Sequence, residues 1–160
     1  MERRFPHFFE SFENGSLTLD DIIQIFFDKE EHTFPLEWFD SEIKDTIGID
    51  ILNIPFPKTR GYEIYHCNNV HILVIRLENM TQCAHEAIKK FLDIDNFTLH
   101  QANAACTKAY DTLYKEFKKK IIFPKQYLDM MYNSKYAQHF YTKKELQKFR
   151  AQWESNDKSK

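Results

Sequence analysis

The chain has 160 residues, 42% of them hydrophobic and 29% charged, which is typical of a globular protein rather than a disordered one. The length fits one compact domain over residues 1–154, and we expect the tail at 155–160 to be disordered. No stretch approaches the roughly 20 apolar residues of a membrane-spanning helix, and the start lacks the apolar core of a signal peptide. Three cysteines favour a reducing compartment, so we expect a cytoplasmic protein.

Glycine occurs only three times, at Gly15, Gly48 and Gly61. A phosphate-binding loop of the type G-x-x-x-x-G-K-S/T needs paired glycines, and a dinucleotide-binding turn needs a closely spaced set. Neither pattern is present. Any nucleotide would therefore be bound without a glycine-rich loop from this sequence.

Charge is distributed unevenly along the chain. Residues 1–100 carry 9 Lys and Arg against 18 Asp and Glu, a balance of −9, whereas residues 101–160 carry 13 against 6, a balance of +7. Two explanations stay open: the two halves attract each other, or the second half meets an anionic partner.

The first half begins with two helical patterns. Thr18 and Asp21 form a variant capping box before apolar residues at helical spacing, which predicts a helix to about residue 31. A second helix is predicted from Phe34-Pro35, where proline suits the first turn, to a stop at Gly48.

The hydrophobic period changes after Gly48. Residues 49–54 predict a short strand or an extended segment, residues 61–66 predict a partly buried strand, and Asn68-Asn69 predicts a turn. The run VHILVIRL at 70–77 is typical of a strand covered on both faces, which implies helices on either side of a sheet.

The rest of the sequence is predicted to be helical, at 81–92, 103–121, 124–132 and 142–153. The last helix begins with a capping box formed by Thr142 and Glu145. Trp38 and Trp153 are expected in the core. A few short strands among about six helices predict an α/β fold with helix in excess.

Residues with metal-binding or nucleophilic side chains do not form a convincing site. Two patterns hold zinc-type ligands, His66-Cys67-x-x-x-His71 and Cys83-x-His85, but no helix face carries a ligand pair. We interpret them as isolated structural residues and predict no metal. Cys106 has no paired histidine and is predicted to pack as a small apolar side chain.

Lysine and tyrosine are concentrated between residues 108 and 141. Lysine supplies charge for phosphate, sulfate or uronate groups, and tyrosine rings stack on sugars or bases. This segment is either an amphipathic helix with a solvated lysine face or a site for a polyanion or nucleotide.

Several longer segments together resemble the capsular polysaccharide synthesis proteins, a sulfotransferase-like family. The resemblance is carried by WFDSEIKDTIGIDI, PFPKTRGYEIY and HILVIRLENM, by Asn103, Lys108 and Tyr110 in an N-x-x-x-x-K-x-Y pattern, and by a C-terminal segment. In that family a Tyr-x-Ser-x-Tyr-x-x-His-Phe-Tyr segment precedes a Glu-containing helix that ends in Trp. The matching residues are Tyr132, Ser134, Tyr136, His139, Phe140, Tyr141, Glu145 and Trp153.

The resemblance implies sulfuryl transfer from 3′-phosphoadenosine-5′-phosphosulfate to a sugar hydroxyl, on a helix-rich, partial P-loop-type three-layer domain with a short parallel sheet. His139 is the candidate base, since imidazole titrates near neutral pH. Arg3 and Lys108 are the candidates for contact with the nucleotide donor. The candidates for contact with the sugar acceptor are Tyr132, Ser134, Tyr136 and Tyr141.

The sequence departs from the family pattern at its N-terminal end. The loop that grips the 5′-phosphosulfate has no counterpart, and Pro6 stands where the family has a serine that contacts the 3′-phosphate. We therefore expect an N-terminally incomplete domain that is incomplete or inactive as an enzyme, because loop amides supply the charge stabilisation that the reaction needs.

The alternative function is a non-enzymatic binding module that holds an anionic glycan, or less readily a nucleic acid, through the Lys/Tyr-rich C-terminal half. A third possibility is a fragment that results from gene decay or from a misplaced start codon. The expected partners are a polysaccharide or glycan acceptor and either a second copy of the chain or a partner that supplies the missing segment.

Overall fold

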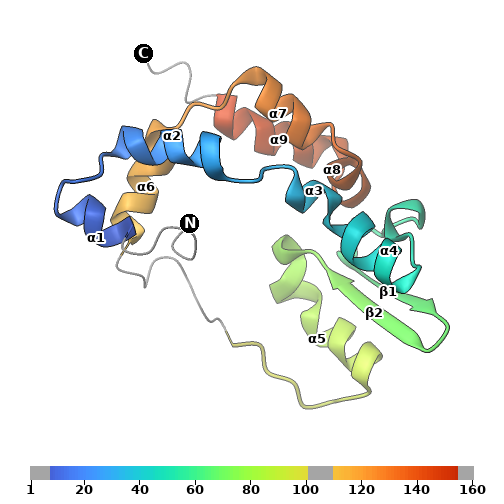
Figure 1. Ribbon diagram of the computed structural model, residues 1–160. Helices are drawn as coiled ribbons and strands as arrows, with labels where there is room; N and C mark the ends of the chain where they lie inside the picture. Colours follow the sequence, from blue (N-terminus) through green and yellow to red (C-terminus); the bar gives the residue numbers. More distant parts are fainter. Residues whose placement is uncertain (1–7, 101–109, 155–160) are drawn as a thin grey trace. The chain divides into compact units, whose positions relative to one another are not determined.

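The computed structural model describes residues 8–100 and 110–154 (Figure 1). Its residues divide into two compact units. Unit 1 comprises residues 8–32, 110–123 and 152–154, and unit 2 comprises residues 33–100 and 124–151. The single domain over residues 1–154 stays a prediction.

Unit 1 is built from α1 (Phe8–Glu13), α2 (Leu19–Lys29) and α6 (Asp111–Lys120). The predicted capping box at the start of α2 is confirmed, because the Thr18 side chain accepts from the backbone of Asp21 while the Asp21 carboxylate accepts from the backbone of Thr18. The predicted helix at 103–121 is confirmed from Asp111 onward, and residues 103–109 lie outside the described residues.

Aromatic rings hold unit 1 together. The Phe26 ring lies 5.6 Å from Phe117 and 5.9 Å from Phe123, and Phe123 lies 5.1 Å from Trp153, all in edge-to-face arrangements. Rings prefer this geometry because the positive edge of one meets the negative face of the other. The expectation that Trp153 packs among apolar residues is consistent with this contact.

Unit 2 begins with a nearly continuous helical segment, as predicted for Phe34 to Gly48. It comprises α3 (Phe34–Trp38), a π-helix η1 (Phe39–Lys44) and α4 (Asp45–Ile47). Gly48 ends it in a left-handed conformation with φ of 87°, which glycine adopts without a Cβ clash.

The segment after Gly48 differs from the predicted strand at 49–54. Residues Ile51–Asn53 form a 3₁₀ turn, η2, with Ile51 and Leu52 buried. Its apolar residues are buried in the core although they belong to a turn. A short apolar run is compatible with a buried turn as well as with a strand, so the sequence alone does not distinguish the two.

The two remaining predicted strands are confirmed as β1 (Tyr62–Cys67) and β2 (Val70–Ile75). They form a two-stranded sheet and are antiparallel, with Tyr62 opposite Ile75 and Cys67 opposite Val70. The expected parallel sheet is therefore wrong for these strands, since two residues can join only antiparallel neighbours. Asn68 sits in the turn with a positive φ of 51°, which asparagine tolerates well.

Apolar side chains cover both faces of this hairpin, as the sequence of the second strand predicts. Leu73 and Ile75 pack on a small cluster of Tyr62, Cys83 and Ala87 beneath α5 (Met80–Leu92), which follows a 3₁₀ turn, η3 (Leu77–Asn79). Ile72 and Val74 pack on the larger cluster of the opposite face, which consists of Ile49, Ile51, Leu52, Phe56, Tyr65 and Phe140. Figure 1 shows α5 beside the hairpin.

Three helices complete the described chain: α7 (Lys125–Tyr132), α8 (Lys135–Phe140) and α9 (Lys143–Glu154). The helices predicted at 124–132 and 142–153 are thus confirmed, whereas α8 has no counterpart in the prediction. The fold is helix-rich with a small sheet, and its relation to the sulfotransferase-like three-layer domain stays a prediction.

Candidate functional site

The short helix α8 is the element on which most predicted site residues lie. Ser134 caps its start, because its hydroxyl oxygen accepts from the Ala137 amide at 3.1 Å and its hydroxyl donates to the Met131 carbonyl at 2.8 Å. The Tyr132 carbonyl accepts from the Gln138 side chain at 2.8 Å. These bonds fix the connection between α7 and α8 and so set the direction in which α8 presents its side chains.

Arg76 is a buried cation at the end of β2, with 6% of its surface exposed. Its guanidinium donates to the Glu145 carboxylate at 2.6 Å and to the Lys58 carbonyl at 3.0 Å, and it lies 4.5 Å from the centre of the Tyr141 ring. A buried charge is tolerated when it is paired and hydrogen-bonded in this way. Arg76 therefore joins the hairpin to the start of α9 and to the end of α8.

Glu145 completes this connection from α9. The predicted capping box is confirmed, because one carboxylate oxygen of Glu145 accepts from the Thr142 amide at 2.7 Å while the other accepts from Arg76. Burial alone would raise the pKa of Glu145, but the hydrogen bonds from Arg76 and Thr142 outweigh it and lower the pKa to about 2.

Glu78 is a carboxylate beside two of the predicted acceptor-contacting tyrosines. The Tyr141 hydroxyl donates to Glu78 at 3.0 Å, and the Glu78 side chain stays 44% exposed. Burial, followed by the negative charge of Glu78, raises the pKa of Tyr141 and also that of Tyr136. Both hydroxyls therefore stay protonated at neutral pH and can donate hydrogen bonds.

Lys58 closes the end of α8. Its ammonium donates to the backbone carbonyls of Gln138 at 2.7 Å and of Tyr141 at 2.9 Å. A cation in this place satisfies carbonyls that have no partner within the helix and complements the negative end of the helix dipole.

His139 is a residue of α8 whose imidazole has a lowered pKa. Burial, aided by the positive charges of Lys58 and Lys135 and opposed by Asp50, lowers the pKa of this imidazole from its ordinary value. Its ring is half-buried against Phe56 and Phe140, and Nε2 is buried with no hydrogen-bond partner among the residues that the structure describes. A substrate proton could reach this nitrogen only if the ring or its neighbours moved.

These residues together are named the α8 site: Lys58, Arg76, Glu78, Tyr136, His139 and Tyr141. The structure brings two predicted residues, Tyr136 and Tyr141, beside Glu78, whereas the His139 ring packs against Phe56 and Phe140. Tyr132 and Ser134 lie at the connection before α8. Arg3 and Lys108, the predicted donor contacts, lie outside the described residues.

Three members of the α8 site were missed by sequence reasoning: Lys58, Arg76 and Glu78. Each of them contacts a residue that lies 63 to 83 positions later in the chain, as in the bond from Lys58 to the Tyr141 carbonyl across 83 positions. No local sequence pattern indicates contacts at such a distance. The one available signal was a charged pair, Arg76 and Glu78, directly after an apolar strand.

An aromatic hollow of about 290 Å³ lies on unit 2 next to the α8 site. It is lined by Phe34, Pro35, Trp38, Phe39 and Tyr136, so Tyr136 belongs to both features. Phe39 and Tyr136 stack with ring centres 6.0 Å apart, and Trp38 meets Phe39 edge-on at 5.2 Å. Trp38 is 39% exposed, which corrects the expectation that it is a core residue.

The candidate metal ligands do not gather into a site. Among residues 8–100 and 110–154, no group of three or more His, Cys, Asp or Glu side chains is arranged to hold a metal ion. His66 and His71 face each other across the hairpin through their Nδ1 atoms, and Cys83 lies apart in the cluster under α5.

Several lysines of the basic second half are paired with acids. Lys115 bonds Asp111 at 2.5 Å, Lys120 bonds Asp20 at 2.6 Å, and Lys125 bonds Asp129 at 2.6 Å. The pair of Lys120 and Asp20 joins the basic half to the acidic half, in agreement with mutual attraction. Within the described ranges, no helix is long and apolar enough to cross a membrane.

The sequence matches a protein-family model over most of its length. Residues 14–142 match the model described as "Putative capsular polysaccharide synthesis protein". The chain belongs to this family. The match includes all six residues of the α8 site and the whole aromatic hollow. No curated protein and no solved structure matches the chain.

Proposed function

We propose that this member of the capsular polysaccharide synthesis family is a sulfotransferase-like protein of the kind that transfers a sulfuryl group from 3′-phosphoadenosine-5′-phosphosulfate to a sugar hydroxyl, and that without a donor loop it is incomplete or inactive as an enzyme by itself. Family membership supports the role in polysaccharide synthesis. The observation that supports an acceptor site is the convergence of Tyr136 and Tyr141 on the half-exposed carboxylate of Glu78.

The α8 site contains the groups that a sugar acceptor needs. A sugar hydroxyl both donates and accepts hydrogen bonds, and Glu78 accepts while the protonated tyrosine hydroxyls donate. Lys58 bonds the carbonyls at the end of α8, and Arg76 lies over the Tyr141 ring with its Nε 3.9 Å from the Glu78 carboxylate. Such fixed partners orient one hydroxyl of the acceptor before reaction.

In the proposed reaction the oxygen of that hydroxyl attacks the sulfur of the donor substrate. The bond between sulfur and the 5′-phosphate oxygen breaks, its electron pair leaves with adenosine 3′,5′-bisphosphate, and the hydroxyl proton passes to neutral His139. A histidine with a lowered pKa can take that proton at neutral pH once its ring or its neighbours move to expose Nε2. Arg3 and Lys108 are proposed to contact the donor, on the strength of the family resemblance alone.

Donor binding tests this proposal most directly. Calorimetric titration of the full chain with adenosine 3′,5′-bisphosphate should give micromolar binding, which Lys108→Ala and Arg3→Ala should each weaken about tenfold or more. Lys119→Ala on α6 is the matched control and should bind like the natural chain. Absence of binding up to millimolar nucleotide would show that the transferase proposal is wrong.

The binding-module alternative is favoured by one observation on α6. Tyr110 and Tyr114 are 47% and 44% exposed, and the Lys118 ammonium lies 4.3 Å from the centre of the Tyr114 ring. Exposed rings beside lysines suit an anionic glycan. In that case affinity for a heparin oligosaccharide should fall steeply with salt, and adenosine 3′,5′-bisphosphate should not compete.

A further inference from the structure

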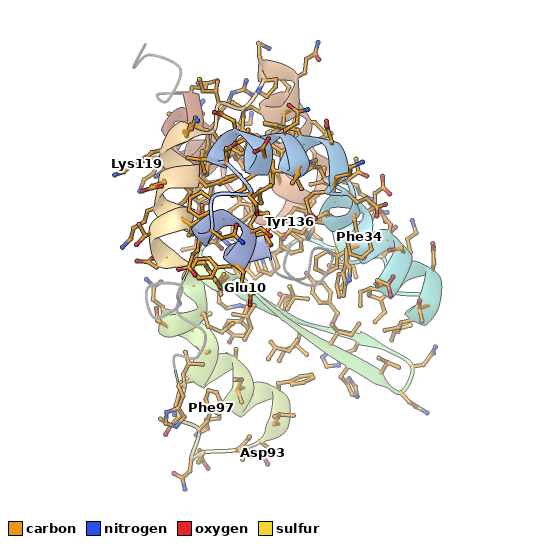
Figure 2. All side chains as sticks on the ribbon, turned by 60° about the vertical axis from the view of Figure 1, so that its left-hand side comes forward. Glu10, Phe34, Asp93, Phe97, Lys119 and Tyr136 are labelled. Atoms are coloured by element: carbon orange, nitrogen blue, oxygen red, sulfur yellow. The ribbon has the colours of Figure 1, made fainter. Side chains whose placement is uncertain are left out.

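The aromatic hollow is built from rings that remain partly open to solvent. Phe34 is 49% exposed although it is a large apolar residue, and Trp38 lies one helical turn later on the same face of the α3 segment. The opposite wall is Tyr136 of α8, and Figure 2 labels Phe34 and Tyr136. Large rings that meet at an open hollow are more typical of a binding surface than of a core.

The lining has little hydrogen-bonding capacity of its own. Four of its five residues are aromatic and the fifth is proline. The Trp38 indole N–H has no acceptor among the residues that the structure describes. An occupant would therefore meet ring faces and one or two hydrogen-bonding groups, such as the indole N–H and the Tyr136 hydroxyl.

The size of the hollow argues for a single ring as its occupant. A volume of about 290 Å³ lies at the lower end of pockets that hold small molecules. Five residues are far fewer than the about 20–30 residues per side of a stable protein interface, so a second copy of the chain does not fit the feature.

We propose that the aromatic hollow is a subsite for one pyranose ring of the polysaccharide, separate from the ring that reacts. The C–H face of a pyranose carries partial positive charge and is attracted to the negative faces of aromatic rings. The ring hydroxyls, at its edge, stay in water or reach the Trp38 indole. The subsite rests on the proposed function for its ligand class, and Tyr136 connects it to the α8 site.

The aromatic hollow would hold the sugar ring that neighbours the reacting ring in the polysaccharide. Because Tyr136 is shared, a saccharide ring in the hollow lies next to the ring whose hydroxyl faces Glu78 and Tyr141. Two adjacent rings of one polymer would then be recognised together, one by stacking and the other by hydrogen bonds. Binding of a disaccharide should therefore exceed binding of a monosaccharide.

Tryptophan fluorescence tests the subsite without any enzymatic reaction. A Trp153→Phe chain leaves Trp38 as the sole tryptophan, and titration with lactose, cellobiose, chitobiose and the corresponding methyl monosaccharides probes its surroundings. At least one disaccharide is expected to change Trp38 emission with millimolar affinity. In the natural chain, Phe34→Ala and Trp38→Ala should weaken calorimetric binding of that disaccharide about tenfold or more, as loss of one stacking ring typically does.

Leu92→Ala is the matched control, because it removes an exposed large apolar side chain from the end of α5, outside both proposed glycan surfaces. It should leave saccharide affinity unchanged. Thermal melting of each variant identifies any that fails to fold, and Trp38→Phe, which keeps an aromatic face, should retain most of the binding.

Three results would overturn the subsite. These are no fluorescence or heat response to any disaccharide, equal affinity in Trp38→Ala, and a change from dimer to monomer in Trp38→Ala, which would mean that a second copy covers the hollow. Titration with adenosine 3′,5′-bisphosphate in the same variants separates the two proposals. Nucleotide binding without saccharide binding disproves the subsite alone, and the reverse disproves the transferase alone.

Discussion

Glu145 has two separate roles, since it caps its own helix and neutralises a buried cation. Its two carboxylate oxygens are divided between the Thr142 amide and the Arg76 guanidinium. The capping role could be predicted from the sequence because both residues lie within one turn. The role toward Arg76 could not, because 69 residues separate the two side chains and nothing local encodes that distance.

Replacement of Glu145 should destabilise the chain more than replacement of an exposed acid. Glu145→Gln leaves Arg76 buried without its anion, and we expect a loss of about 2–4 kcal/mol at pH 7, reduced from the fully buried case because Glu145 is partly exposed. Urea unfolding measures this loss. Glu116→Gln, on the exposed face of α6, is the control and should change stability by less than about 0.5 kcal/mol.

The contribution of Glu145 should also depend on pH. Its folded-state pKa of about 2 lies below the ordinary value of 4.5, so the carboxylate stabilises the folded chain above pH 4.5. That contribution is lost as the pH falls from about 4.5 toward 2. The difference in unfolding free energy between the natural chain and Glu145→Gln should therefore shrink over this range, and a constant difference would contradict the assignment.

His139 gives a prediction for the proposed reaction. Its pKa is lowered from the ordinary value of 6.5, so the rate of any sulfuryl transfer, measured together with the partner that supplies the missing segment, should fall only below pH 6.5. His139→Gln should reduce the rate about 10²–10⁴-fold. A pH–rate profile with radiolabelled sulfate donor measures both, and His85→Gln on the exposed face of α5 is the control. An unchanged profile in His139→Gln would exclude it as the base.

At the scale of elements, local signals identified the helices and the hairpin but not all their details. Capping boxes at Thr18 and Thr142 fixed two helix starts, because cap and partner are only three residues apart. The segment 49–54 was misassigned because short apolar runs suit a strand and a buried turn alike. The parallel sheet was predicted from the family resemblance, whereas the two-residue turn between the strands favours an antiparallel hairpin.

Gly61, the residue before β1, should tolerate substitution by alanine less well than Gly15. It has a φ of +79°, and a Cβ there would lie 2.4 Å from the Asn79 Cβ, so η3 would have to move away from β1. Gly15 has a similar φ of +77° but open space around it. Gly15→Ala should cost about 1–2 kcal/mol through backbone strain alone, and Gly61→Ala about 1–3 kcal/mol more. Thermal or urea unfolding of both variants compares them, and equal losses would contradict the clash.

At the scale of the whole molecule, the two units differ in how much apolar surface they bury. Both core clusters lie in unit 2, whereas α1 has no buried residue and α2 and α6 have one each. Burial of a helix face supplies most of the stability of short helices. Unit 2 should therefore open less often than unit 1.

Hydrogen exchange followed by mass spectrometry measures this difference. Amides of β1 and α8 should exchange at least about a hundredfold more slowly than those of α1, since exchange from poorly packed elements requires only local opening. Equal protection of α1 and β1 would show that the chain opens as one cooperative body.

The π-helix η1 has a consequence for how this family can change in length. Each i→i+5 bond encloses one more residue than an α-helical bond, so Phe39–Lys44 holds a residue in excess of the α-helix that would join the same ends. Deletion of one residue there would restore an α-helix, and Trp38 and Ile47 would stay on the sides of the helix that they occupy now. The same loss within α5 would turn every later residue of that helix by about 100°. Natural relatives that differ by a single residue should therefore carry the gap in this segment, as the trace of an ancestral insertion.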